Sequence, residues 1–315
     1  MRKIESALLL FLACVMLLPS IKAAEKPFAF SKGQTVSYKT DKNLPLVVRT
    51  ALDVVAKDMR SVLDASFRSA PSNGAANIVV HTLKAGEKDA LAGRHEAFRM
   101  EMKSGVLHIT GSDANGTAYG VGELSRLLGV SPWVWWADNV PGKLNKWSVP
   151  ADYKSVQEPA VAYRGIFIND EDWGMCPWSW KTDDPSDVSG RIGPKTHERI
   201  FELLLRLRAN TFWPAMHECS VPFFFTEGNR EMADKYGITI GTSHCEPMQR
   251  NTNGEWRKVG VGEYDFIHNR QNVLDFWENR VKEVAHSNNY FTLGMRGIHD
   301  SGMLGVKSVD EGREA

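Results

Sequence analysis

Apolar residues in the first half of the chain recur with two different spacings, which predicts a small α/β unit. Residues 46–63 place Val, Leu and Met side chains three or four positions apart, as an amphipathic helix does. Residues 98–103 and 106–111 alternate instead around Ser104-Gly105, which predicts a β-hairpin. The other elements expected in this unit are two strands and a helix, over 35–38, 77–81 and 116–128.

The pattern changes near 150–159, and short apolar strands then alternate with helices. This order predicts a parallel sheet, and a (β/α)8 barrel is the leading fold, with a doubly wound domain as the alternative. The expected strands cover 162–168, 210–214, 238–242 and 290–295, and the expected helices cover 196–208, 230–236 and 272–286. We therefore expect an α/β domain over 24–150, followed at 160–315 by the first half of a barrel that the sequence truncates.

The first 23 residues have the pattern of a signal peptide. Arg2 and Lys3 precede an apolar run over 7–18, and Ile21-Lys22-Ala23 offers a cleavage site. A lipoprotein signal built on Cys14 fits this pattern less well. The sequence thus predicts a secreted or periplasmic protein.

The amino-acid composition argues against some classes of binding partner. Lys+Arg and Asp+Glu both number 38, so no net charge attracts nucleic acid or, after signal cleavage, a membrane surface. Ten Trp residues suit either an aromatic core or stacking on sugar rings. The three cysteines beyond Cys14, at 176, 219 and 245, do not form a disulfide framework and allow at most one bridge.

Ionisable residues gather after each of the four strands expected in the second half. In a βα barrel such strand ends surround the active site. The segments concerned are 169–173, 213–218, 243–247 and 296–302. Their carboxylates suit glycosidic hydrolysis, which needs one acid to protonate the leaving oxygen and a second carboxylate. Arg296 suits an acidic sugar, since a guanidinium holds a carboxylate through two hydrogen bonds.

Other chemistries fit the sequence less well. It has no GxSxG nucleophile motif and no Gly-rich phosphate loop. A zinc site built from the histidines at 217, 244 and 299 is an alternative, although HxH and HExxH spacings are absent. Neighbours on a regular strand also face opposite sides, so only one member of His217-Glu218 or His299-Asp300 would face the cleft.

A family resemblance is carried by four segments in the second half. They read EPAVAYRGIFINDEDW (158–173), ANTFWPAMHE (209–218), GTSHCEPM (241–248) and GMRGIHDSG (294–302). These segments resemble the catalytic barrel of glycoside hydrolase family 115. The preceding domain resembles the α/β domain before the barrel in this family and in family 67 α-glucuronidases. The resemblance implies an inverting α-1,2-glucuronidase that releases (4-O-methyl)glucuronic acid from glucuronoxylan, without a cofactor or metal.

Roles follow from position at the strand ends. Asp300 is the predicted acid/base, and Glu218 is predicted to position water or hold hydroxyls, so both are assigned as catalytic. We expect Asp300, Glu218 and Arg296 to meet in one pocket. The residues predicted to bind substrate are Asp170, Asp172, Trp173, His217, His244, Glu246, Arg296 and His299.

Two further functions stay open at this point: an exo-glycosidase of another sugar, similar to hexosaminidases, and a carbohydrate-binding protein without catalysis. Members of the family are much longer than 315 residues. We therefore expect the full-length parent to be an enzyme, in a form that could be a homodimer, and this chain alone to be inactive.

Overall fold

A sheet and two helices form the N-terminal part of the protein in the computed structural model, which describes residues 28–169, 171–294 and 296–314. The expected signal peptide and Asp170 lie outside these ranges. Among the described residues this sheet has six strands, which run parallel except β5, and β5 pairs antiparallel with both β6 and β8. In spatial order they are β3 (Ser66–Ser69), β2 (Thr35–Thr40), β4 (Ile78–Thr82), β6 (Val106–Gly111), β5 (Phe98–Lys103) and β8 (Lys154–Gln157).

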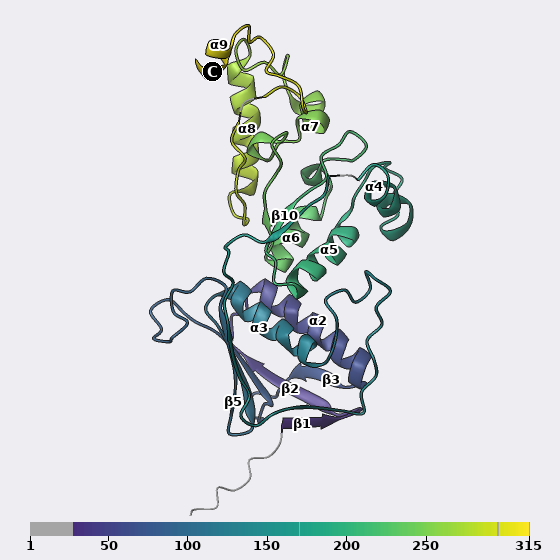
Figure 1. The fold of residues 1–315 in the computed structure, drawn as a ribbon, viewed down its shortest axis with the longest axis vertical. Coiled ribbons are helices and arrows are strands. Elements are labelled where there is room, and N and C mark those ends of the chain that lie inside the picture. Colours follow the sequence, from purple (N-terminus) through teal and green to yellow (C-terminus); the bar gives the residue numbers. More distant parts are fainter. Residues whose placement is uncertain (1–27, 170, 295, 315) are drawn as a thin grey trace, which may run out of the picture.

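Helices α2 (Leu46–Leu63) and α3 (Ala114–Leu127) cover one face of this sheet (Figure 1). Asp113 caps α3, because its carboxylate accepts a hydrogen bond of 2.8 Å from the Gly116 amide. A second, two-stranded antiparallel sheet joins β1 (Phe28–Ser31) to β7 (Lys146–Val149), and Trp147 packs against the phenylalanines of β1.

Three parallel strands form the second layer of the molecule. The strand β10 (Thr211–Trp213) lies between β9 (Gly165–Phe167) and β11 (Thr239–Ile240). Helix α5 (Pro194–Arg206) connects β9 to β10, and α6 (Asn229–Tyr236) connects β10 to β11. This βα alternation with parallel pairing is the arrangement that the sequence pattern predicted, and the mixed α/β class is confirmed.

The two layers are joined by helix packing and by buried polar contacts. Helices α5 and α6 rest on α2 and α3, so the four helices lie between the two sheets (Figure 1). Glu96, in the first layer, accepts a hydrogen bond of 2.9 Å from the side-chain amide of Asn210, which lies in the second layer. One continuous apolar core accordingly includes side chains of both layers.

The remaining helices lie around and beyond the second sheet. At the end of the molecule far from β1, α7 (Thr252–Val259) and α8 (Arg270–Val284) enclose a smaller core of aromatic rings and Val273. Shorter helical segments are α4 (Met175–Trp178), η1 (Ser179–Asp183), η2 (Phe223–Phe225), η3 (Pro247–Gln249) and α9 (Val309–Glu314).

The longer periodic elements match the sequence prediction, and the short ones depart from it. The predicted helix 46–63 has the bounds of α2, and the hairpin strands have those of β5 and β6. Of the strand expected at 290–295, the described residues 290–294 form no strand, and a parallel bridge joins Ile240 to Asn289, just before that range. Helix α7 was not expected, because its buried positions are mostly polar and give no apolar period.

Candidate active site

The ionisable residues singled out by sequence follow β9, β10 and β11, as predicted. The carboxyl ends of parallel neighbours share one edge of a sheet, and the loops there approach one another. Glu171 and Asp172 follow β9, and His217 and Glu218 follow β10. The turn after β11 carries the next group, at 243–246, and the segment 296–302 completes the set.

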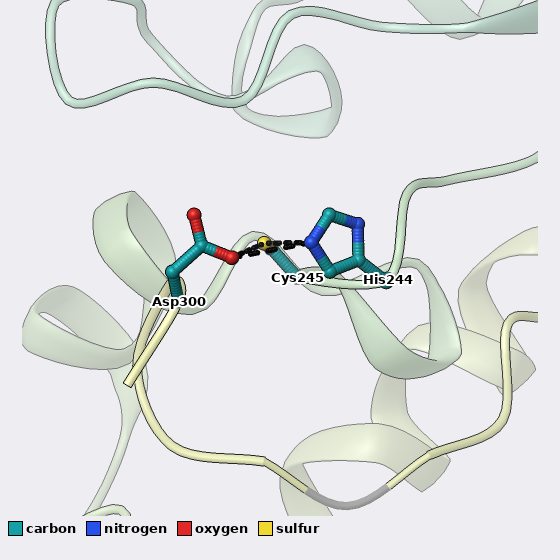
Figure 2. A group of neighbouring side chains, drawn as sticks. All are labelled: His244, Cys245 and Asp300. Atoms are coloured by element: carbon teal, nitrogen blue, oxygen red, sulfur yellow. Dashed lines mark hydrogen bonds and ion pairs between the residues drawn. The ribbon is translucent and has the colours of Figure 1, made fainter. Parts of the chain in front are cut away.

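Asp300 contacts the side chains of His244 and Cys245 (Figure 2) and those of Arg296 and His299, with which it forms one group. Its Oδ1 lies 3.2 Å from Nε2 of His244, 3.4 Å from Sγ of Cys245 and 3.0 Å from Nη2 of Arg296. Its Oδ2 lies 3.5 Å from Nδ1 of His299. The structure therefore brings four predicted site residues together and adds Cys245, which sequence reasoning assigned no role.

These contacts control the charge of Asp300. Hydrogen bonds from Cys245 and then His244, together with the charges of His299 and Arg296, hold the pKa of Asp300 below its usual value. Burial, with the nearby Asp300 carboxylate, raises the pKa of the Cys245 thiol to about 11. At neutral pH Asp300 is thus an ionised carboxylate, and the Cys245 thiol is not a nucleophile.

A hydroxyl group joins the two loops that form this group. Thr252 Oγ1 donates to the Cys245 carbonyl at 3.2 Å and accepts from the His299 amide at the same distance. His299 has a φ of 53°, which is left-handed backbone that non-glycine residues seldom adopt. The turn at His299 places its ring and the Asp300 carboxylate on the same side, which the alternation of a regular strand would not allow.

Glu171, Asp172 and His217 form a second group. Glu171 is fully buried, and its Oε1 accepts from the amides of Met216 at 2.9 Å and His217 at 2.7 Å. His217 Nδ1 hydrogen-bonds Asp172 and lies 3.7 Å from the other Glu171 oxygen. The His217 imidazole holds the pKa of Asp172 below its usual value.

The two groups are neighbours. The rings of His217 and His299 lie 5.8 Å apart, edge to face. In each group, ligand atoms of three side chains lie within 4.8 Å of one another, so either could hold a metal ion. These sets are His244, Cys245 and Asp300 in one group and Glu171, Asp172 and His217 in the other.

Glu246 lies beneath this surface and does not reach it. Its side chain is buried, and burial followed by the negative charge of Glu255 raises its pKa well above the usual value. Glu255 in turn pairs with two buried guanidinium groups, those of Arg250 at 2.6 Å and Arg280 at 2.9 Å. Glu246 is therefore buried under the loops, whereas the sequence predicted it as a substrate-binding residue.

Glu218 is separate from the Asp300 group. It is largely exposed, forms an ion pair of 3.2 Å with Arg257, and lines a groove of about 330 Å³ with Cys219 and Ser220. The expected meeting of Asp300, Glu218 and Arg296 is therefore found for Asp300 and Arg296 only. Trp173 is 92% exposed, whereas the indole of Trp213 donates a hydrogen bond to the Tyr290 hydroxyl.

Two of the neighbours that complete the site were given no role from the sequence. Cys245 lies within the 241–248 segment and Thr252 lies outside the four segments, and their contacts with Asp300 and His299 depend on the fold of the loops. Among the described residues all three cysteines are free, and Cys176 Sγ donates to the Cys219 carbonyl at 3.3 Å. None of the helices within the described ranges is long and apolar enough to cross a membrane.

The family model of glycosyl hydrolase family 115 matches residues 156–312. Among solved structures, a family GH115 4-O-methyl-α-glucuronidase with specificity for decorated arabinogalactans is 51% identical, with a TM-score of 0.87. The match covers 91% of this chain and 39% of that enzyme, so the chain spans well under half of its relative's length. The search of curated proteins found no match.

More distant structures share less of the fold. A mutant β-hexosaminidase from Streptomyces plicatus, in complex with N-acetylglucosamine, is 14% identical with a TM-score of 0.47, over 70% of this chain and 43% of that one. A GH138 enzyme that targets pectin rhamnogalacturonan II is 16% identical with a TM-score of 0.41, over 66% and 24%. At these values neither likeness bears on function.

Proposed function

The chain belongs to glycosyl hydrolase family 115, and on that ground we propose that it carries the uronate-binding part of an α-glucuronidase active site. The observation on which this rests is the Asp300 group, in which Arg296 and two histidines surround one exposed carboxylate. We propose that the substrate is a (4-O-methyl)glucuronic acid side chain of a polysaccharide and that its carboxylate binds Arg296 and His244.

Substrate binding would give Asp300 the proton that a general acid needs. In the free protein the surrounding donors stabilise the ionised form of Asp300. A uronate that takes over Arg296 and His244 withdraws two of these donors and adds a negative charge nearby. Both changes raise the pKa of a carboxyl group. Asp300 would then be protonated in the complex and could transfer that proton to the glycosidic oxygen.

A second carboxylate is required, and its distance from the acid sets the stereochemical outcome. An inverting enzyme needs a separation of roughly 6.5–9.5 Å, which leaves room for a water molecule. We do not assign this base to Glu218, because its carboxylate pairs with Arg257. We propose that the base, and with it full activity, needs residues of a longer protein in which units such as β9–α5 and β10–α6 form part of a (β/α)8 barrel.

The natural polysaccharide is proposed to be glucuronoxylan, and the protein is proposed to act outside the cytoplasm. Because the 51% identical relative has specificity for decorated arabinogalactans, arabinogalactan is the comparison substrate. Release of glucuronic acid from both polymers, assayed with this chain and with a longer form that contains it, would discriminate between them. Preference for arabinogalactan would contradict the xylan assignment but not the glucuronidase assignment.

The uronate contact can be tested by binding alone. Titration calorimetry with glucuronate should detect binding to the unaltered chain, weakened about tenfold or more in Arg296→Ala, while Glu278→Gln on the exposed side of α8 serves as the matched control. Glucose, which lacks the carboxylate, should bind equally to all three proteins. Unchanged glucuronate affinity in Arg296→Ala would exclude this site.

A further inference from the structure

Glu171 presents a buried carboxylate oxygen that no hydrogen-bond donor in the described part of the chain satisfies. Its side chain has 0% exposure, and Oε2 has no hydrogen-bond partner among the described residues. A buried carboxylate oxygen without a donor or a cation is costly, and native structures seldom retain one. A donor or a cation is therefore expected to face it.

The other oxygen of Glu171 keeps this one in place. Oε1 accepts from two consecutive amides, of Met216 and His217, and from Ser220 Oγ at 3.3 Å. With Oε1 saturated, rotation of the carboxylate would break three hydrogen bonds. Oε2 is therefore held toward His217 Nδ1, at 3.7 Å, which is too long for a hydrogen bond.

Two further ligand atoms converge on the same point. His217 Nδ1, an Asp172 oxygen and a Glu171 oxygen all lie within 4.8 Å of one another. Ligand atoms around a zinc ion at about 2.1 Å are themselves about 3.4 Å apart. His217 Nδ1 already lies 3.7 Å from Oε2 of Glu171, close to that spacing. It is in direct hydrogen-bond contact with Asp172, so an ion requires small rotations of these two partly exposed side chains that move them apart. Glu171 is already positioned by its backbone donors.

We propose that Glu171, Asp172 and His217 form a binding site for a divalent transition-metal ion of the zinc type. Two carboxylate oxygens and one imidazole nitrogen are ligands that Zn²⁺ accepts, and three protein ligands leave a fourth position for water. The ion would displace the proton between His217 and Asp172 and would satisfy Oε2 of Glu171. This site is distinct from the Asp300 group and stands whether or not the chain acts on glucuronate.

The alternative explanation is a protonated His217 held between two carboxylates. Such an ion pair neutralises charge, and its hydrogen bond goes to Asp172. It leaves Oε2 of Glu171 without a donor, which is the feature that a metal ion would explain. Metal binding distinguishes the two directly.

The test is calorimetry of the chelator-treated 315-residue protein with Zn²⁺, supported by Co²⁺ absorption spectra. One equivalent should bind, and Asp172→Asn and His217→Ala should each weaken the affinity about tenfold or more. Glu171→Gln should do the same. Glu171 is buried, so the folding of the Glu171→Gln variant is checked by circular dichroism. If that variant is unfolded, the Asp172→Asn and His217→Ala variants decide the test.

Matched controls lie in the neighbouring group. His244→Ala and Asp300→Asn remove two ligand atoms of the other set and should leave Zn²⁺ affinity unchanged. Absence of binding by the unaltered protein would overturn the proposal. So would a loss of affinity confined to His244→Ala and Asp300→Asn, which would move the metal to the Asp300 group.

Discussion

Nη2 of Arg296 lies 3.0 Å from Oδ1 of Asp300, four residues along a segment that is not helical. The same oxygen is approached by Nε2 of His244, from a loop 56 residues earlier in the chain. The carboxylate is thus shared by a local contact and a long-range one. Their separate effects on its proton affinity can be measured.

His244→Ala is expected to raise the pKa of Asp300 toward its ordinary value. The His244 hydrogen bond contributes more to the lowered pKa than the charge of Arg296 does, so Arg296→Ala should raise it less. Titration of the carboxyl carbon by ¹³C NMR would measure both shifts. His286→Ala, on an exposed histidine outside the Asp300 group, is the control. A larger shift in Arg296→Ala than in His244→Ala would contradict this order.

Arg206→Ala is expected to destabilise the contact between the two layers. Arg206 on α5 donates hydrogen bonds of 2.7 and 3.0 Å to Asp58 on α2, and both side chains are 7% exposed. Removing the guanidinium leaves a buried carboxylate unpaired, which costs about 3 kcal/mol. Urea denaturation should show this loss of unfolding free energy.

Arg49→Ala, at an exposed position of α2, should change that free energy by less than about 0.5 kcal/mol. The double variant Arg206→Ala with Asp58→Ala should lose less than the sum of the two single changes, since the unpaired charge is removed. Additive losses would show that the two groups do not interact.

The Asp89–Arg99 pair is expected to make stability depend on acidity between about pH 4 and pH 2. The Arg99 guanidinium, with the Leu91 amide, lowers the pKa of Asp89 to about 2. A lowered folded pKa contributes stability above the unfolded value, about 3.9, and loses it as pH falls through the folded value. For a pair near the surface the contribution is about 1 kcal/mol. In Asp89→Asn the difference in unfolding free energy from the unaltered protein should vanish near pH 2, and a constant difference would contradict the assignment.

Gly165→Ala is expected to disrupt the pairing of β9 with β10. A Cβ at Gly165 would lie 1.8 Å from the Thr211 carbonyl oxygen, so the strands must separate, at a cost of about 2 kcal/mol or more. Gly122→Ala is the matched control, because a Cβ there meets nothing within 4 Å and the change favours helix α3 by about 0.5–1 kcal/mol. Equal melting temperatures for the two variants would refute the steric argument.

Local periodicity accounts for much of the fold. The apolar spacing of 46–63 predicted α2 with its bounds, and Ser104-Gly105, both with positive φ, form the hairpin turn, in which Gly105 is the favoured residue type. The polar residues after each apolar strand indicated which edge of the second sheet would carry the site. These features depend on neighbours in the chain, so the residues themselves contain the information.

Which side chains meet in the Asp300 group and in the Glu171 group was decided by the folding of the loops. Cys245 contacts Asp300, 55 residues later in the chain, and Glu218 forms an ion pair with Arg257. Glu171 accepts hydrogen bonds from two backbone amides that lie 45 and 46 residues later in the chain. Nothing in the spacing of apolar and polar residues distinguishes Glu171 from its neighbour Asp172. The backbone of these loops leaves the regular alternation of a strand, as His299 does with its left-handed φ. A side chain's direction there depends on packing between distant segments, which is a property of the folded chain and has no local pattern.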